Sequence, residues 1–407
     1  MPTSCTNKST KSLANDVYPA RRLASKPSNL FALRSSLLLA TIILATAQGR
    51  AQCPVTELSS GLHFPLGITQ STEGNLLVSE SGTGLPNTGR ISIVDREGNR
   101  RTLLDGVPSG INDVGEPSGP AGLFMRGRTL YVVIGVGDSL LPGPVPNPNL
   151  SSPIFSSILE IHFSANVERN NPQFTLTSAD QQALAAGQTV TLSNGAGEKV
   201  MLKLIANLPD FTADPTSPSG LRNTNPFDLV VVDDQVYVTD GGQNAIWQVA
   251  SSTGDFSTLV SFPQVPNPLP IGPPFLDAVP TGIAYTDGEL LSTLFKGFPF
   301  VPDTAVVEQV DPLTGYHTSF ITGRTAAIDV VAIKEGDDTD YLVLQFASGL
   351  FLSGPGLLLR FESPDSPPTV LADCLITPTS MALDAKTGAL YVTELATARV
   401  VAIPAAP

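Results

Sequence analysis

Three acidic residues in this chain close the same short motif, and their spacing makes them the first candidates for shared chemistry. Glu80 ends the segment LLVSE, Asp240 ends VYVTD and Glu394 ends LYVTE, and Asn244 follows Asp240 in the run DGGQN. Equivalent positions of a repeated unit face a common axis or a common end surface. Carboxylates that converge there would suit Ca²⁺, which takes six to eight oxygen ligands. We therefore treat these four residues as candidate ligand-binding residues, and the three acids as a candidate Ca²⁺ site.

The same pattern also has a local explanation. A carboxylate at the end of a strand accepts hydrogen bonds from backbone N–H groups of the neighbouring turn. Such bonds repeat with the strand and need no ligand. The sequence favours this local role and leaves the metal site open.

Other motifs that carry chemistry are missing from the sequence. It has no G-x-S-x-G elbow, no G-x-x-x-x-G-K-[ST] loop and no H-E-x-x-H pair. Three histidines lie far apart in the sequence: His63, His162 and His317. Unrelated turn or surface positions explain them better than one metal site. The acidic run Asp337, Asp338 and Asp340 is typical of a solvated hairpin turn, with Ca²⁺ binding as the alternative. The catalytic residues are therefore unknown at this level.

The elements that must position these residues form a repeat. Six similar segments each follow a turn and hold a short apolar strand: 74–84, 128–137, 234–244, 288–297, 340–349 and 388–397. Matched positions from Leu76 to Leu390 are separated by 54, 106, 54, 52 and 48 residues. Most of these segments have one apolar strand before them and two after. A period near fifty residues with four strands is the signature of propeller blades. The sequence predicts an all-β, six-bladed β-propeller.

Two irregularities complete the predicted architecture. The sixth unit lacks a fourth strand, and Val55–Leu58 is expected to supply it, closing the ring with an N-terminal strand in the last blade. The long interval is interpreted as an insertion in blade two, residues 164–200, rather than a seventh blade. A short helix is expected from Ser178 to Ala186, and Asn194-Gly195 indicates a hairpin. Residues 53–407 then form one propeller domain.

Two stretches resemble the ScyD/ScyE family. They are NPFDLVVVDDQVYVTDGGQNAIWQV from Asn225 and VPTGIAYTDGELLSTLFKGFPFVPDTAVVEQVDPLTG from Val279, with GVPSGINDVGEPSGPAGL as a third matching loop. The resemblance implies an exported, NHL-like six-bladed propeller whose relatives accompany scytonemin pigment genes in cyanobacteria. It carries over no settled biochemical role. Leu294 stands where the family has an acid before GFPF, which weakens the idea of a complete ring of acids.

The amino terminus indicates export. Residues 1–34 carry six basic residues and one acid, and the apolar run SLLLATIILATA follows from Ser36 to Ala47. A membrane span needs about 20 apolar residues, whereas a basic region, a short apolar run and Ala45-x-Ala47 suit a cleavable secretory signal. We expect residues 1–52 to be a targeting segment, cut between about residues 47 and 52. The mature protein would be secreted or periplasmic, without a membrane span.

Charge excludes one class of partner. Residues 1–52 hold seven of the 23 basic residues and one of the 37 acidic residues, so the remainder has 16 basic and 36 acidic residues and a net charge of −20. Such a surface repels phosphate backbones and anionic lipid. We expect no nucleic-acid partner, and a monomer that meets an unknown small molecule or protein.

Cys53 and Cys374 are the two cysteines of the expected mature chain. An oxidising compartment permits a disulfide between them, and the loop-entropy model gives about 5 kcal/mol for a loop of about 320 residues. In a regular propeller the two positions lie at opposite ends of their strands, so the bridge requires the segment before Val55 to fold back. Two free thiols are the alternative.

Three functions are compatible with these residues. The first is a non-catalytic binding or scaffold protein that uses loops at the channel mouth, with no certain cofactor. The second is a Ca²⁺-dependent, lactonase-like hydrolase. The third is a structural envelope or matrix protein. Bound Ca²⁺ that depends on Glu80 or Asp240 would separate the second function from the first.

Overall fold

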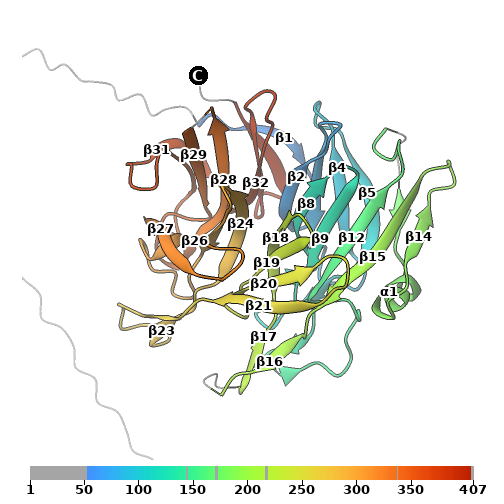
Figure 1. Cartoon of the computed structure of the whole chain (residues 1–407), viewed down its shortest axis with the longest axis horizontal. Coiled ribbons are helices and arrows are strands. Elements are labelled where there is room, and N and C mark those ends of the chain that lie inside the picture. The colour runs from blue at the N-terminus through green and yellow to red at the C-terminus, as the bar shows by residue number, and fades with distance from the viewer. Residues whose placement is uncertain (1–52, 144, 170–172, 216–218, 337, 405–407) are drawn as a thin grey trace, which may run out of the picture. The chain divides into compact units, whose positions relative to one another are not determined.

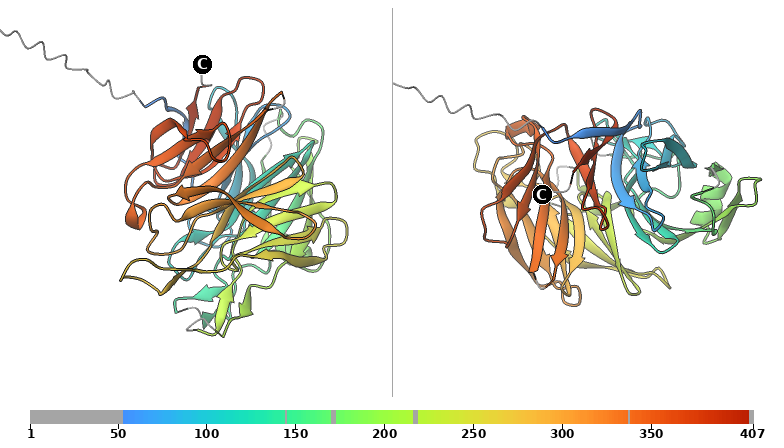
Figure 2. Two further views of the ribbon diagram at one scale, coloured as in Figure 1. Left: turned by 60° about the vertical axis from the view of Figure 1, so that its left-hand side comes forward. Right: turned by 90° about the horizontal axis from the view of Figure 1, so that it is seen from above.

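The computed structural model describes residues 53–143, 145–169, 173–215, 219–336 and 338–404. The expected targeting segment, residues 1–52, lies outside them. Within the described residues, six sheets of four or five strands, antiparallel except for one added parallel strand, are arranged in a ring (Figures 1 and 2). The first strands of all six sheets line the central channel. The predicted all-β, six-bladed propeller is confirmed.

Each blade is a four-stranded meander whose first strand lies nearest the channel. From inner to outer strand, blade one consists of β2 Pro65–Gln70, β3 Leu76–Glu80, β4 Gly89–Val94 and β5 Arg100–Val107. Blade two consists of β8 Pro120–Arg126, β9 Thr129–Ile134, β12 Ser157–Phe163 and β15 Lys199–Asn207. Blade three consists of β18 Pro226–Val232, β19 Gln235–Asp240, β20 Ala245–Ala250 and β21 Phe256–Ser261. Blade four consists of β24 Pro280–Thr286, β25 Glu289–Leu294, β26 Ala305–Val310 and β27 His317–Arg324. Blade five consists of β28 Ala327–Glu335, β29 Asp338–Gln345, β30 Gly356–Phe361 and β31 Thr369–Leu375. Blade six consists of β32 Pro378–Leu383, β33 Leu390–Glu394, β34 Arg399–Ile403 and β1 Thr56–Ser60.

The ring closes through its first strand, as predicted. β1 pairs antiparallel with β34, from Thr56 opposite Ala402 to Ser60 opposite Arg399. The blue N-terminal strand therefore lies beside the red C-terminal strands in Figure 2. Cys53, just before β1, forms a disulfide with Cys374 in β31, with Cα atoms 6.0 Å apart. The bridge links the lead-in of the last blade to the outer strand of the blade before it.

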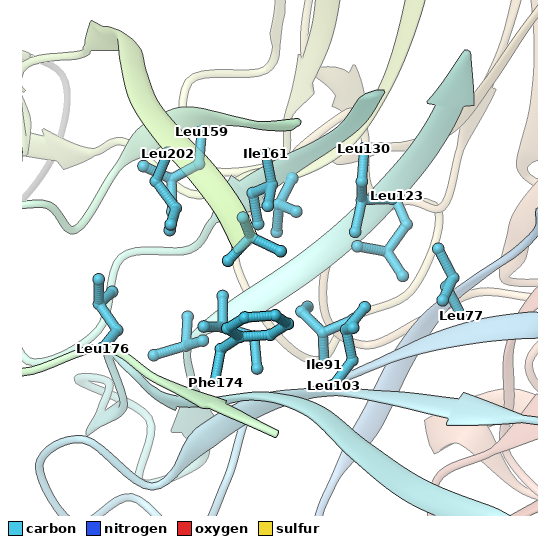
Figure 3. Close-up of a cluster of buried hydrophobic side chains, with 14 of the residues drawn as sticks. Leu77, Ile91, Leu103, Leu123, Leu130, Leu159, Ile161, Phe174, Leu176 and Leu202 are labelled. Atoms are coloured by element: carbon cyan, nitrogen blue, oxygen red, sulfur yellow. The ribbon is translucent and has the colours of Figure 1, made fainter. Parts of the chain in front are cut away.

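Burial explains why these segments are strands. All five residues of β3 are buried, because both faces of the sheet pack against neighbouring blades. The outer strand β15 instead alternates between exposed and buried residues over much of its length. Figure 3 shows the core between blades one and two, where Leu77 and Ile91 meet Leu130 and Ile161. Similar apolar clusters lie between the other blades.

The insertion between β12 and β15 joins the first two blades. β13 (Phe174–Thr175) pairs parallel with β5, and β14 (Val190–Ser193) pairs antiparallel with β15. Between them lies the predicted helix, α1 (Ser178–Ala185). Its cap is one residue earlier than expected, because Thr177 and Asp180 form the capping box. Phe174 is buried in the core of Figure 3, so the insertion is integral to that core.

The remaining elements are short. Four two-stranded hairpins decorate the connections: β6 Gly110–Ile111 with β7 Pro117–Ser118, β10 Leu140–Leu141 with β11 Val145–Pro146, β16 Phe211–Ala213 with β17 Leu221–Asn223, and β22 Val265–Pro266 with β23 Phe275–Leu276. A 3-10 turn, η1, spans Leu350–Leu352. In the described part of the chain, no helix is long and apolar enough to cross a membrane.

Candidate functional site

The inner strands bring two aspartates into the channel. A cavity of about 480 Å³ is lined by all six inner strands and contains Asp228 and Asp329. Asp228 is the third residue of β18 and Asp329 the third residue of β28. Both also line the narrow waist that follows the cavity along the channel. Two carboxyl groups from different blades therefore share one cavity.

A bulge in each inner strand creates this position. The pairing of the first two strands shifts at the start of every blade, for example between Pro226 and Asp228 and between Ala327 and Asp329. A bulge re-aims a side chain and leaves backbone groups unpaired in the ladder. The aspartates use those groups: Asp228 accepts a hydrogen bond from Ile283 N at 3.1 Å. Each carboxylate thus lies at a bulge instead of at a regular pleat.

Glycines in the preceding blades make room for the aspartates. A Cβ at Gly122 would lie 2.4 Å from the Asp228 Cα, and one at Gly282 would lie 2.6 Å from the Asp329 Cα. Real side chains do not tolerate such contacts with backbone. Neither glycine has a positive φ, so the requirement is close approach and not backbone conformation. The P-x-G pattern of Pro120–Gly122 and Pro280–Gly282 is therefore part of the site.

Asp329 is the better stabilised of the two carboxylates. Its oxygens accept hydrogen bonds from Val330 N at 2.8 Å, Met381 N at 2.8 Å and Ser380 Oγ at 3.1 Å. Burial raises its pKa to about 6 despite these donors. Burial also raises the pKa of Asp228 well above its usual value, and the Asp329 carboxylate adds to that rise. Asp228 nevertheless keeps partial access to the cavity.

The two groups therefore favour a state near neutral pH in which one carboxyl group is protonated and the other is ionised. Two like charges in one cavity disfavour double ionisation. Asp329 holds the negative charge more easily because three donors point at it, so Asp228 is the member that keeps the proton. A carboxylate can act as a general base, and a carboxylic acid can act as a general acid.

The residues that the sequence suggested lie elsewhere. Glu80, Asp240 and Glu394 are fully buried at the ends of β3, β19 and β33, in blades one, three and six. They accept backbone hydrogen bonds from His63 N at 2.5 Å, Asn225 N at 2.8 Å and Ile376 N at 2.7 Å, respectively. Each acid thus fastens the segment that leads into the inner strand of its own blade. The structure does not bring the three acids together.

Side-chain partners complete these three local networks. Glu80 accepts from Ser92 Oγ and lies 3.4–3.5 Å from Arg100 and Arg90. Asp240 accepts from Trp247 Nε1 at 2.8 Å, and Glu394 pairs with Arg399 at 2.6 Å.

Asn244 belongs to a separate polar group. Its Nδ2 donates to Asp277 at 2.7 Å, and its Oδ1 accepts from Val279 N at 3.0 Å. Asp277 also contacts Arg222 at 3.1 Å. Although burial opposes it, hydrogen bonds from Gln264 and Asn244, together with the Arg222 guanidinium, hold the pKa of Asp277 below its usual value.

These positions do not support the Ca²⁺ site that the sequence left open. The described residues contain no group of three or more His, Cys, Asp or Glu side chains that could hold a metal ion. His63 contacts Arg90, His162 contacts Thr129 and His317 contacts Glu308, so the histidines are not together either. Within the acidic run, Asp340 pairs with Arg360, and Asp337 lies outside the described residues.

Sequence reasoning missed Asp228 and Asp329, although a signal for them existed. The third residue of the inner strand is Gly67, Gly122, Asp228, Gly282, Asp329 or Ser380 across the six blades. An acid in a position that otherwise holds glycine or serine is unusual. Aligning the first strands of the repeat, instead of the second, would have shown it.

No protein-family model and no curated protein matches this sequence. Among solved structures, the chain is similar to a gluconolactonase from Xanthomonas campestris, with 11% identity, a TM-score of 0.48 and coverage of 86% of this chain and 89% of that one. A PQQ-bound aldose sugar dehydrogenase from Streptomyces coelicolor is 15% identical, with a TM-score of 0.47 and coverage of 87% of this chain and 98% of that one. The PQQ domain of pyranose dehydrogenase from Coprinopsis cinerea is 12% identical, with a TM-score of 0.49 and coverage of 86% of this chain and 95% of that one.

These comparisons correct one expectation from the sequence. The chain was expected to be a non-catalytic binding or scaffold protein, whereas the similar structures are named as two dehydrogenases and a lactonase. That expectation is contradicted. At such low identity the likeness concerns the fold alone, so the reaction must be argued from this chain's own residues.

Proposed function

We propose that the chain is a hydrolase that opens a lactone, a cyclic ester, in its channel cavity, with Asp228 and Asp329 as the acid–base pair. The observation that carries the proposal is the meeting of two carboxyl groups with raised pKa values in one cavity of about 480 Å³. Groups with perturbed pKa values in a cavity are typical of active sites.

The proposed reaction needs one proton acceptor and one proton donor. The Asp329 carboxylate removes a proton from a water molecule as its oxygen attacks the lactone carbonyl carbon. The bond from that carbon to the ring oxygen then breaks, and the Asp228 carboxylic acid gives its proton to the leaving oxygen. The product is a hydroxy acid. At this point Asp329 holds the proton taken from water and Asp228 is ionised, so one proton must pass from Asp329 to Asp228, directly or through a water molecule, before the next cycle. General acid–base catalysis of this kind typically contributes 10²–10⁴-fold.

The cavity suits a neutral substrate better than an anionic one. Its wall combines polar side chains such as Gln70 and Tyr285 with apolar ones such as Phe124 and Met381. The two channel aspartates and the acidic surface oppose the entry of anions. A lactone is uncharged, whereas its hydroxy-acid product is negatively charged at neutral pH. The negative charge of the channel therefore does not oppose entry of the substrate, and it repels the product.

The channel residues do not fit the Ca²⁺ ion considered from the sequence. Asp228, Asp329 and the Ser380 hydroxyl supply few oxygen ligands compared with the six to eight that Ca²⁺ takes. We therefore assign no step to a metal.

A direct test measures acid release from γ-butyrolactone, δ-valerolactone and dihydrocoumarin in a pH-stat. Wild-type protein should hydrolyse at least one of them, and EDTA should not stop it. Asp329→Asn should lose about 100-fold or more in rate. Asp365→Asn, which changes an exposed carboxylate far from the channel in sequence, should keep the wild-type rate. Equal rates in the wild type and Asp329→Asn would refute the proposal.

We also infer that the chain belongs to the ScyD/ScyE family and is exported. The GFPF segment after Lys296 and the repeat from Asn225 support the family, and the basic and apolar runs before Gln48 support export. Mass spectrometry of protein recovered outside the cytoplasm should give a new amino terminus between Gln48 and Cys53. Full-length protein confined to the cytoplasm would contradict export.

A further inference from the structure

Five phenylalanine side chains form a connected cluster at the opposite mouth of the channel. In order of contact they are Phe346, Phe295, Phe300, Phe298 and Phe351, and the ring centroids of successive members lie 5.8–6.0 Å apart. We call this set the phenylalanine cluster. Phe298 and Phe351 are each 51% exposed. Large apolar side chains grouped at the surface mark interaction sites more often than isolated ones do.

The backbone presents these rings in an uncommon conformation. Phe300 has a φ of 61° and Phe351 a φ of 57°, in the left-handed region that bulky side chains rarely adopt. Such conformations cluster at functional sites. The two loops are joined by a hydrogen bond from Phe351 N to Pro299 O at 3.2 Å. The fold therefore fixes the rings in place instead of burying them.

A cavity of about 260 Å³ opens beside the phenylalanine cluster. Three of the five phenylalanines line it, together with Phe64, Phe227 and Ile328. Its polar wall includes Asn112, which accepts hydrogen bonds from Val114 N and Glu116 N of its own turn. The constriction at Asp228 and Asp329 separates this cavity from the proposed catalytic cavity. The channel thus has two differently lined ends.

We propose that this mouth is a second ligand site, for an uncharged molecule with fused aromatic rings. Phenylalanine edges and faces pair favourably with aromatic rings, and the volume suits a small molecule and not a protein segment. Glu116 lines the same cavity, and the chain after residue 52 carries a net charge of −20, so an anion is disfavoured. This site is independent of the hydrolase proposal, because its occupancy needs no turnover.

Two probes with the same ring skeleton test the charge preference. N-phenyl-1-naphthylamine is neutral, and 1-anilinonaphthalene-8-sulfonate adds one negative charge to the same rings. Fluorescence titration of the purified wild-type protein should show saturable binding of the neutral probe and clearly weaker binding of the sulfonate. Glu116→Gln should narrow the difference. Equal affinity for both probes would overturn the assignment of an uncharged ligand.

Matched variants locate the site. Phe298 and Phe351 do not line the cavity but extend its apolar wall at the surface through Phe300. Phe298→Ser with Phe351→Ser should therefore weaken binding of the neutral probe about tenfold. Leu313→Ser with Tyr316→Ser removes two exposed apolar residues of another loop and should leave the affinity unchanged. Asp329→Asn should also leave it unchanged, which separates this site from catalysis. Similar affinities in both double variants, or a dimer that the Phe298/Phe351 variant abolishes, would overturn the proposal.

Discussion

At the scale of single residues, the channel depends on what occupies the third position of each inner strand. Glycine there lets the neighbouring blade approach closely, as the contacts of Gly122 and Gly282 show. Aspartate at the same position in β18 and β28 reaches into the channel and accepts hydrogen bonds from the next blade. The residue type was visible in the sequence. The proximity of Asp228 and Asp329 was not, because 100 residues separate them and only ring closure brings their blades into one channel.

Replacing Asp329 should change how stability depends on pH. Burial raises its pKa to about 6, whereas aspartate in an unfolded chain titrates near 3.9. Between these values the folded state binds more protons, so stability falls as pH rises. From pH 4 to pH 7, the wild type should lose up to about 3 kcal/mol more than Asp329→Asn. Urea unfolding at both pH values measures the difference.

Comparing how the free energy of unfolding changes between the two pH values controls for other effects of the substitution. A constant cost of placing an asparagine amide beside the Val330 and Met381 N–H groups cancels between the two pH values. Asp365→Asn, at an exposed position, should follow the wild-type curve. If the Asp329→Asn curve runs parallel to the wild-type curve, Asp329 does not have a raised pKa.

At the scale of elements, the repeat was predictable and the site was not. Apolar runs, turns and the period near fifty residues are local patterns, so they identified the blades, and the β1 closure followed from the missing fourth strand. The parallel pairing of β13 with β5 joins segments about 70 residues apart and has no local pattern. The strand-end acids were recognised correctly as a repeat. Their side chains turn back into their own blades because unpaired loop N–H groups lie within reach.

Removing a strand-end acid should therefore cost stability. Asp240→Ala would leave three buried or partly buried donors without their acceptor, those of Asn225 N, Gln243 N and Trp247 Nε1. Each lost acceptor costs about 1–3 kcal/mol, so we expect a loss of several kcal/mol in urea unfolding followed by Trp247 fluorescence. Adding Ca²⁺ should not raise the melting temperature of the wild type. A Ca²⁺-dependent increase that Asp240→Ala abolishes would support the metal site instead.

At the scale of the whole molecule, the ring has one seam, and two devices close it. β1 completes the last blade, and the Cys53–Cys374 disulfide crosses from that blade to the previous one, joining cysteines with a sequence separation of 321. The bridge forms because the chain before β1 folds back toward β31, an arrangement that regular propeller geometry does not require. Sequence reasoning could state the two outcomes but could not choose between them.

Opening the disulfide should destabilise the ring. Cys53→Ser with Cys374→Ser should lower the free energy of unfolding by up to about 5 kcal/mol, because the unfolded chain regains the freedom of a very long loop. Thermal unfolding of the wild type, with and without reductant, should show the same effect, and the double serine variant should not respond to reductant. Two reactive thiols per denatured, unreduced wild-type chain would show that the bridge is absent.

The pH dependence of kcat/KM is the most direct test of the proposed hydrolysis of a lactone by the Asp228–Asp329 pair. For the wild type, the account predicts a rate that rises as Asp329 ionises near pH 6 and falls at higher pH as Asp228 loses its proton. Asp329→Asn should lose the low-pH limb together with about 100-fold or more of the rate. A wild type that opens no lactone, or a pH profile that Asp329→Asn leaves unchanged, would contradict this function.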